Sequence, residues 1–335
     1  MEYRRLGVSG LKVSPICLGA MMFGNRTSEK DGIKIIDHAR GAGINFIDTA
    51  DAYHQGASEI VVGKGIKKDR DDWVLGTKVH NQMGKGANRK GLSRKWLIQA
   101  CEESLKRLGT DYIDIYYFHK DDDGTPFDES LEAVTQLIRD GKIRYYGVSN
   151  FFGWRTTLLC MTAESLGLPL PVAVQPYYNP MTREAEKDLL PACEHFGLGV
   201  VPYSPLARGI LTGKYGLAAE PAKGSRAGDG DKRMLETEWR PENLKLAQKV
   251  IKHAEKKGMT SIDWAMNWVL ANQNVSSVLA GPRTLAQWKA YLGALDHMDK
   301  WSEKDEVFWD KLVSPGHPST PGYNDPQYPI MGRPV

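Results

Sequence analysis

The sequence predicts an α/β protein whose strands close into a (β/α)8 TIM barrel. Eight short apolar segments alternate with amphipathic helical segments along the chain. A polar loop follows each apolar segment, and a glycine ends many of the helical ones. Tandem strand–helix units form parallel sheets with right-handed crossovers, and eight units favour closure into a barrel. An open, doubly wound sheet is the alternative architecture.

Several predicted strands are apolar at consecutive positions, as expected where both faces of a parallel sheet are covered. The strands span residues 16–19, 45–48, 73–78, 113–119, 145–149, 173–175, 199–203 and 277–280. The predicted helices span residues 31–42, 93–108, 128–140, 153–166, 183–196, 240–256 and 262–270. Glycines that can take the left-handed conformation at helix ends are Gly43, Gly109, Gly141, Gly167 and Gly197.

Three segments lie outside this repeat. Residues 1–14 contain two short alternating runs around a Gly-Val-Ser-Gly turn and predict a β-hairpin. Residues 216–233 are rich in Gly, Ala, Asp and Lys and predict a mobile loop. Residues 314–335 form a Pro/Gly-rich tail, whose Tyr323 and Tyr328 indicate packing on the protein. We expect one domain over residues 1–335.

The composition restricts the classes of partner. The formal net charge is +3 and there is no dense basic stripe, so nucleic-acid binding has no electrostatic support. No apolar run has the length of a membrane helix, and the opening residues lack a signal-peptide pattern. The widely spaced Cys17, Cys101, Cys160 and Cys193 fit neither a metal-ligand pattern nor a disulfide framework. We therefore expect a cytoplasmic protein with no metal, no membrane and no nucleic-acid partner.

Ionisable residues follow three neighbouring strands. Asp48 ends the second strand, Tyr53 stands five positions later, and Lys78 and His119 end the next two strands. The carboxyl ends of the strands form the active-site face of a parallel barrel. Each residue alone has a structural explanation, as a helix-capping acid, a half-buried tyrosine or a solvated lysine. Together, such groups are costly to desolvate unless they are used.

The chemistry of these four side chains is coherent. A phenol with a pKa of ~10 exchanges protons poorly at neutral pH. A nearby ammonium lowers the pKa of a phenol, so we expect Lys78 to lower the pKa of Tyr53, with Asp48 holding Lys78. A neutral His119 would orient a carbonyl. This relay reduces C=O to CH–OH only with a hydride donor, so a cofactor is required.

These residues lie in blocks that resemble the signatures of the aldo-keto reductases. The blocks span residues 46–53, 76–78, 117–119, 147–150 and 203–215. Residues 3–14 resemble the branch that contains potassium-channel β-subunits and several bacterial reductases. The resemblance runs from residue 1 to about residue 312. It implies a barrel with the hairpin closing its floor, and a catalytic tetrad of Asp48, Tyr53, Lys78 and His119.

The resemblance also implies a nicotinamide cofactor bound without a Gly-rich dinucleotide fingerprint. The residues implied at the nicotinamide are Ser149, Asn150, Gln175 and Tyr203, the last stacked on the ring. The residues implied at the pyrophosphate are Ser204, Leu206, Arg208 and Lys214, with Ser225 and Arg226 from a covering loop.

The adenine end departs from the family pattern. Gly281, Arg283 and Gln287 match it, whereas Ala290 and Tyr291 replace the usual Glu-Asn pair. A guanidinium binds phosphate in a fork, so the candidates for a 2′-phosphate are Arg226, Arg283 and Lys289. We therefore expect NADPH/NADP+, with NAD as the alternative. The competing interpretation is that Arg283 and Lys289 are ordinary solvated positions.

The predicted function is an NADP(H)-dependent oxidoreductase acting on a small carbonyl, sugar-like, aromatic or aliphatic, or on the corresponding alcohol. The alternatives are an NAD-dependent sugar or pyridoxal-type dehydrogenase and a non-catalytic, cofactor-sensing subunit. A metal-dependent barrel hydrolase or aldolase is disfavoured because the His-x-His strand pattern and clustered carboxylates are missing. The sequence leaves open the substrate and the oligomeric state, a homo-oligomer included. Candidates for the pocket wall, with packing as the alternative role, are Met21, Met22, Phe23, Trp154, Tyr177 and Tyr178.

Overall fold

The computed structural model describes residues 1–217 and 220–329. Within it the chain forms two compact units. The first unit consists of residues 1–176, 188–203 and 273–289, and the second consists of residues 177–187, 204–272 and 290–335. The expectation of a single domain over residues 1–335 stays a prediction.

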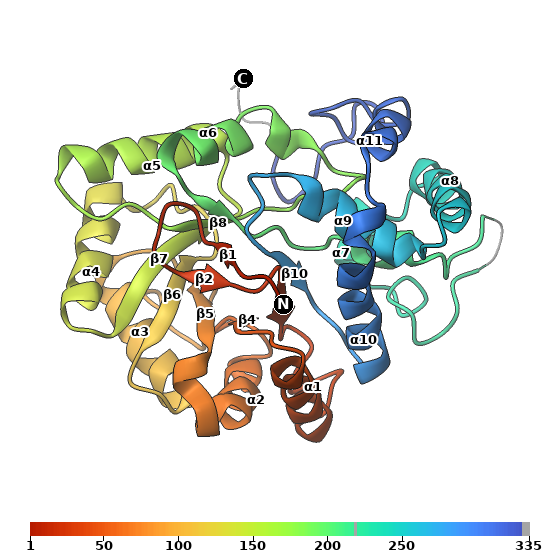
Figure 1. Ribbon diagram of the computed structural model, residues 1–335. Helices are drawn as coiled ribbons and strands as arrows, with labels where there is room; N and C mark the ends of the chain where they lie inside the picture. Colours follow the sequence, from red (N-terminus) through yellow and green to blue (C-terminus); the bar gives the residue numbers. More distant parts are fainter. Residues whose placement is uncertain (218–219, 330–335) are drawn as a thin grey trace. The chain divides into compact units, whose positions relative to one another are not determined.

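The first unit is a closed barrel of eight parallel strands, as predicted (Figure 1). The strands are β3 (Ile16–Gly19), β4 (Phe46–Asp48), β5 (Val74–Val79), β6 (Ile113–Phe118), β7 (Ile143–Ser149), β8 (Ala173–Gln175), β9 (Gly199–Val200) and β10 (Val278–Ala280). β10 pairs with β3, and the others follow in chain order. Bridges of Val200 with Val275 and of Tyr203 with Leu279 join the two remaining edges. This closure excludes the open, doubly wound sheet.

Helices cover the outside of the strands in Figure 1. They are α1 (Glu29–Gly41), α2 (Ala57–Ile66), η1 (Lys67–Asp72), α3 (Arg94–Leu108), α4 (Phe127–Arg139), α5 (Gly153–Ser165) and α6 (Leu189–Phe196). The Ser93 hydroxyl accepts from the backbone N–H of Trp96 and caps α3. Gly109 and Gly197 end α3 and α6 at φ values of 65° and 68°, which confirms their predicted role.

Two helices differ from the sequence prediction. The predicted helix 183–196 is wrong at its start, because α6 begins at Leu189 and only a short 3-10 turn, η2 (Glu184–Glu186), precedes it. The ring of Pro191 excludes a helical carbonyl four residues earlier, at Lys187. α2, which contains two glycines, is absent from the helices predicted from the sequence. A Cβ at Gly63 would lie 2.0 Å from the Leu108 carbonyl oxygen, so glycine lets α2 approach α3 closely.

The predicted hairpin is confirmed. β1 (Arg4–Arg5) and β2 (Lys12–Val13) pair antiparallel and lie across the end of the barrel that faces the viewer in Figure 1. The side chains of Leu6 and Val13 are fully buried in one cluster with Cys17 and Phe46 of the barrel strands. The hairpin therefore supplies apolar side chains that fill the amino-terminal end of the barrel.

The second unit is helical over its described residues. Its elements are η2, η3 (Ala207–Thr212), α7 (Lys232–Thr237), α8 (Pro241–Lys256), α9 (Ser261–Ala271), η4 (Ala294–Lys300) and α11 (Glu303–Asp310). α10 (Leu285–Gly293) begins in the first unit and ends in the second. The fully buried Trp264 of α9 packs against Trp301 and Trp309, with ring centroids 5.6 Å and 5.3 Å away. α8 and α9 match the predicted helices 240–256 and 262–270.

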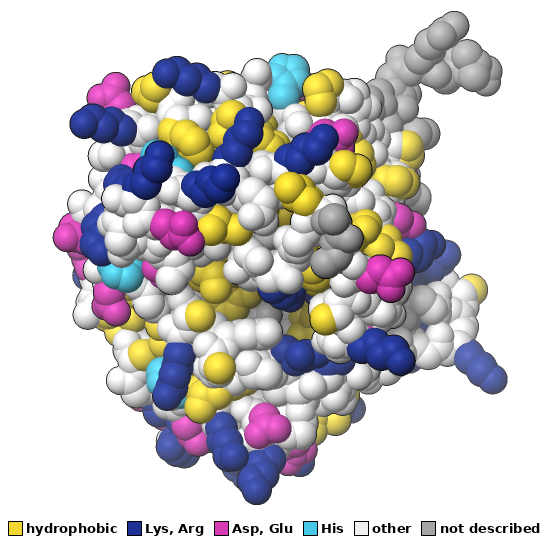
Figure 2. Space-filling model, turned by 90° about the vertical axis from the view of Figure 1, so that its right-hand side faces the viewer, with side chains coloured by type: hydrophobic (Ala, Val, Ile, Leu, Met, Phe, Trp, Pro, Cys, Tyr) yellow, Lys and Arg dark blue, Asp and Glu magenta, His cyan; other side chains and the backbone are white. Residues whose placement is uncertain are grey.

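The surface charges, the helix lengths and the cysteines of the described residues can be compared with the expectations about nucleic acid, membranes and disulfides. Figure 2 shows one face, on which the Lys and Arg side chains of the described residues are scattered among acidic, hydrophobic and neutral ones. In the described ranges, every helix is too short or too polar to cross a lipid bilayer. All four cysteines are buried free thiols.

Candidate active site

The four tetrad residues meet at the carboxyl ends of β4, β5 and β6 in the first unit. Lys78 of β5 is fully buried, and its ammonium group has three hydrogen-bond acceptors. It donates to the carboxylate of Asp48, to the carbonyl of Thr49 at 2.7 Å and to the hydroxyl of Tyr53 at 3.3 Å. The three protons of the ammonium are thereby used, which fixes its position between the acid and the phenol.

The electrostatics keep Lys78 charged. Burial lowers the pKa of the Lys78 ammonium, but Asp48 and Tyr53 more than offset this, so its pKa is raised overall. Burial raises the pKa of Asp48, and Lys78 together with a hydrogen bond from Gln175 opposes that rise. Each partner thus stabilises the charged form of the other, and both side chains are buried.

Lys78 lowers the pKa of Tyr53, as expected, but it does not bring that pKa below the ordinary value. Burial raises the pKa of this phenol above its ordinary value of 10.0, and the nearby Lys78 offsets the rise only in part. The carboxylates of Asp48 and Asp51 act in the same direction as burial. Tyr53 is therefore a protonated phenol at neutral pH, and Lys78 limits how weak an acid it becomes.

His119 is a neutral imidazole. Burial lowers its pKa far below the usual range, and the cations Lys78 and Lys120 lower it further. Its Nδ1 lies 3.2 Å from the amide nitrogen of Asn81, which donates to it. The proton is then on Nε2, so His119 can donate a hydrogen bond from that atom. Its ring meets Tyr53 edge-on, with centroids 5.7 Å apart.

Asn81 is a candidate site residue that was not predicted from the sequence. A matched pair of variants tests its role in fixing the imidazole tautomer. Asn81→Asp places an acceptor beside Nδ1, so we expect the proton to move there and kcat for carbonyl reduction to fall by about tenfold. Gln82→Glu adds the same charge at an exposed neighbour and should leave kcat unchanged. Steady-state kinetics from pH 6 to 9 make the comparison; equal kcat values for the two variants would contradict the assignment.

The residues implied at the nicotinamide join the tetrad in one network. Gln175 donates to Asp48 at 3.0 Å, and the amide of Asn150 donates to the carbonyl of His119 at 2.9 Å and to Ser149 at 3.0 Å. The hydroxyl of Tyr203 donates to Asn150 at 2.7 Å. Asn150 has a left-handed backbone, φ 57°, a conformation that costs energy and gathers at functional sites.

The residues implied at the adenine end follow β10. The side-chain oxygen of Gln287 accepts from the backbone N–H of Arg283 at 2.8 Å, and the hydroxyl of Thr27 donates to the Arg283 carbonyl at 2.8 Å. These bonds fix the backbone that carries the Arg283 side chain. Gly281 and Lys289 are exposed.

The residues implied at the pyrophosphate lie in the second unit, within or next to η3. The backbone there is unusual, with positive φ values at Ser204 (59°), Ala207 (46°), Arg208 (51°) and Gly209 (105°). A turn that mixes left- and right-handed residues directs backbone N–H groups toward one point and binds anions. Such strain in non-glycine residues accompanies function. The segment that also carries Leu206 and Lys214 is therefore a candidate to hold a phosphate group.

Arg226 adds positive charge in the same unit. Burial lowers the pKa of its guanidinium, Asp231 at 3.2 Å opposes this, and the positive charge of Arg208 lowers it again. Burial raises the pKa of the nearby Tyr291 to about 12, so this residue stays neutral. Ser225 holds the turn before Arg226 by donating to the Ala222 carbonyl at 2.6 Å. Arg226 and Arg208 both act electrostatically on the single carboxylate of Asp231, and this excess of positive charge suits an anionic ligand.

The remaining candidates for the pocket wall differ in their exposure to solvent. Phe23 is fully buried, and Tyr178 packs against Trp268 with centroids 5.1 Å apart, so both are packing residues. Tyr177 is hydrogen-bonded to the buried Glu238. Trp154 is 61% exposed.

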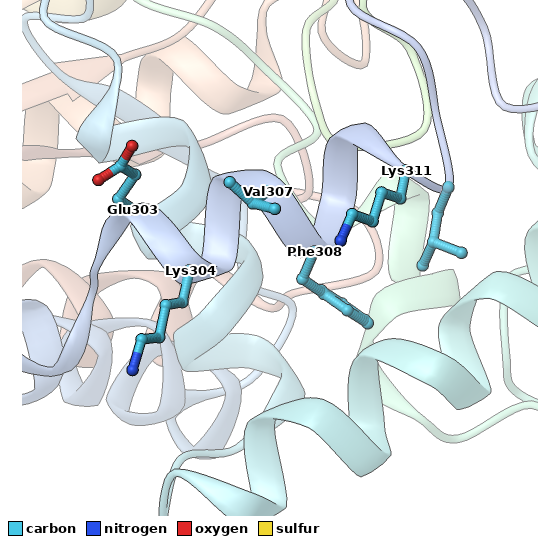
Figure 3. Close-up of a pocket in the computed structure, with 6 residues that line it drawn as sticks. Glu303, Lys304, Val307, Phe308 and Lys311 are labelled. Carbon is cyan, nitrogen blue, oxygen red and sulfur yellow. The ribbon is translucent and has the colours of Figure 1, made fainter.

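A surface pocket on α11 contains none of the predicted site residues. Figure 3 draws its lining residues as sticks, and the ring of Phe308 stacks on His253 of α8 with centroids 3.8 Å apart. The lining residues are Glu303, Lys304, Val307, Phe308, Lys311 and Leu312. The geometry of the first unit, and not this pocket, therefore defines the candidate site.

Comparisons with known proteins agree with this geometry. The family model described as "Aldo/keto reductase family" matches residues 15–310. The "Probable voltage-gated potassium channel subunit beta" of Arabidopsis thaliana is 36% identical over 301 residues, covering 88% of this chain and 92% of the relative. The "Uncharacterized oxidoreductase YrpG" of Bacillus subtilis is 38% identical over 311 residues, covering 88% and 91%. A match over most of the chain, with a closed parallel barrel, shows that the chain belongs to the aldo/keto reductase family.

Proposed function

We propose that the protein is an NADP(H)-dependent oxidoreductase that interconverts a small aldehyde or ketone and its alcohol. One observation carries the proposal: the buried ammonium of Lys78 bridges Asp48 and the Tyr53 hydroxyl beside the neutral His119. A proton donor, a cation that stabilises its conjugate base and a neutral hydrogen-bond donor are the groups that carbonyl reduction needs. Free thiols at all four cysteines suit the reducing cytoplasm expected for it.

Each site residue of the first unit would have its own role in the proposed reaction. Bound NADPH would supply the hydride, held at its nicotinamide by Ser149, Asn150 and Gln175. His119 would orient the carbonyl oxygen through its Nε2–H. Tyr53 would transfer its proton to that oxygen as negative charge develops there. Lys78 would stabilise the phenolate left behind.

A panel of carbonyls and alcohols tests the proposal, with the absorbance of reduced nicotinamide as the readout. Turnover of at least one carbonyl, lost on replacement of Tyr53, is the expected result. The panel should include sugars, pyridoxal, short aldehydes and quinone-like ketones, because variable loops decide the substrate.

The raised pKa of Tyr53 predicts how the rate depends on pH. Reduction needs the protonated phenol, so its kcat should stay level from neutral pH and fall only above the ordinary phenol value of 10.0. Oxidation of the alcohol needs the phenolate, so its kcat should increase as the pH rises toward that value. Initial rates in both directions at matched ionic strength make the measurement. A fall in the reduction rate between pH 7 and 8 would contradict this assignment.

The second expected property is a preference for NADPH over NADH. Arg226 of the second unit and Arg283 of the first unit are the two arginine candidates to bind the 2′-phosphate. Replacing Arg283 with glutamine should weaken NADPH binding by about tenfold to a hundredfold and leave NADH binding nearly unchanged. Replacing Arg226, which is also a candidate at the pyrophosphate, should weaken the binding of both cofactors. Titration of tryptophan fluorescence gives both affinities, and Lys95→Gln, at an exposed lysine of α3, serves as the control. Tighter binding of NADH by the unmodified protein would contradict the preference.

A second candidate function comes from the relatives. Several are described as potassium-channel β-subunits, which suggests a non-catalytic, cofactor-binding subunit. The complete tetrad favours the enzyme. Capture of a partner protein together with no turnover on any carbonyl would favour the subunit.

A further inference from the structure

The tail of the chain extends beyond the match to the family. That match ends at residue 310, and the structure describes a further stretch up to residue 329. The first part of this tail is bound to the second unit by its backbone. The N–H of Gly316 donates to Glu186 at 2.9 Å, and the N–H of Ser319 donates to the carbonyl of Met181 at 2.9 Å. The tail is thus an ordered segment, in agreement with the packing expected from its tyrosines.

The second part of the tail binds helix α7. Asp325 forms a two-pronged ion pair with Arg233, with one contact of 2.9 Å, and both side chains are largely buried. The hydroxyl of Tyr323 donates to the carbonyl of Glu236 at 3.1 Å. The guanidinium of Arg240 lies over the Tyr323 ring, 3.7 Å from its centroid. The tail therefore contacts α7 by an ion pair and a hydrogen bond.

α7 in turn holds the two arginines of the candidate anion site. Its N-cap Asp231 accepts from the Nε of Arg226 at 3.2 Å and caps the helix through the N–H of Met234 at 2.9 Å. At its other end, Thr237 accepts from the Nε of Arg208 at 3.0 Å. α7 has only six residues, and a helix of this length is unstable without outside contacts.

We propose that Asp325 and Tyr323 are positioning residues, which hold α7 so that Arg208 and Arg226 face a cofactor pyrophosphate and its release is slowed. This inference rests on the proposed function for the identity of the ligand. Without the tail contacts, α7 unfolds from its ends. Asp231 and Thr237, which accept hydrogen bonds from Arg226 and Arg208, then move, and the two guanidiniums no longer point toward the same ligand. The tail thereby sets the residence time of the cofactor without touching the reacting atoms.

The first test uses the full-length protein without cofactor. Asp325→Asn removes the charge that pairs with Arg233 and keeps the shape of the side chain. Trypsin should cleave within residues 220–233 about tenfold faster in this variant, as located by mass spectrometry. Asp299→Asn removes an exposed acid of the same unit and should leave the cleavage rate unchanged. Equal cleavage of Asp325→Asn and the unmodified protein would overturn the proposal.

The second test measures release of NADPH by stopped-flow fluorescence. Asp325→Asn and Arg233→Gln should each accelerate release by about tenfold, and the double variant should be no faster than either single one. Tyr323→Phe, a smaller change, should have a lesser effect in the same direction. Faster cleavage with unchanged release would overturn the proposal, because the tail would then stabilise α7 alone.

The proposed function and the positioning role of the tail can be disproved by different results. If no nicotinamide nucleotide binds the unmodified protein, the proposed function fails, and inorganic pyrophosphate becomes the probe for Arg208 and Arg226. Calorimetry should then show weaker pyrophosphate binding by Asp325→Asn than by Asp299→Asn. Equal binding by the two variants, or none by the unmodified protein, would overturn the role of the tail.

Discussion

Replacement of Tyr53 by phenylalanine is expected to lower the turnover of carbonyl reduction by roughly 10²–10⁴-fold. The change removes one hydroxyl, which is the proton donor in the proposed reaction. Lys78 keeps its bonds to Asp48 and to the Thr49 carbonyl, so the barrel should remain folded. The affinity for NADPH should change little, because the ring stays and the groups implied in binding lie elsewhere.

Tyr117 offers a matched control for this variant. It is also a fully buried tyrosine on a barrel strand, and its hydroxyl has no hydrogen-bond partner among the described residues. Tyr117→Phe should therefore leave kcat and the cofactor affinity unchanged. If Tyr53→Phe retained near-normal turnover on a good substrate, the proton would come from another group, with His119 the first to examine.

Replacement of Lys78 by methionine should abolish measurable turnover and destabilise the protein. It leaves the buried Asp48 without its cation, and breaking a buried ion pair in this way costs about 3–5 kcal/mol. Lys78 is also what limits the pKa of Tyr53, so its removal should raise that pKa further above 10.0. Any residual oxidation of alcohol should therefore need a higher pH than in the unmodified protein.

A double variant separates the two effects of Lys78. Asp48→Asn combined with Lys78→Met removes both charges, so thermal unfolding should recover much of the lost stability. Turnover should stay absent, because the phenol still has no cation beside it. Recovery of turnover in the double variant would show that Lys78 acts only through the stability of the barrel.

The barrel could be predicted from the sequence because each strand–helix repeat carries the same local signals. An apolar segment, a polar loop and a helix ended by a residue such as Gly109 recur, and closure follows from their number. The start of α6 was predicted wrongly because residues 183–187 are good helix formers, whereas the ring of Pro191 excludes a helical carbonyl at Lys187. α2 was missed because its glycines reduce helix propensity, and tertiary packing explains them: Gly63 lies against α3 and Gly65 against Ile36 of α1.

The site was predictable in its residue types and less so in its energetics. Asp48, Lys78 and His119 stand at strand ends, which a sequence pattern can locate. The direction of the pKa shift of Tyr53 depends on how much solvent the fold removes, and no local pattern carries that quantity. In the sequence, Asn81 is one polar loop residue among many, and only the folded structure shows its contact with the imidazole of His119.

The pairing of β10 with β3 has a consequence for how the native state is reached. Ile16 and Val278 pair across nearly the whole length of the chain, so this ladder has a very high sequence separation. The strands that carry the tetrad can associate with near neighbours while a chain is still being synthesised. Closure must wait for the synthesis of β10 and must overcome the entropy of a long loop. Until then two sheet edges are unpaired, and intermolecular association competes with closure for them.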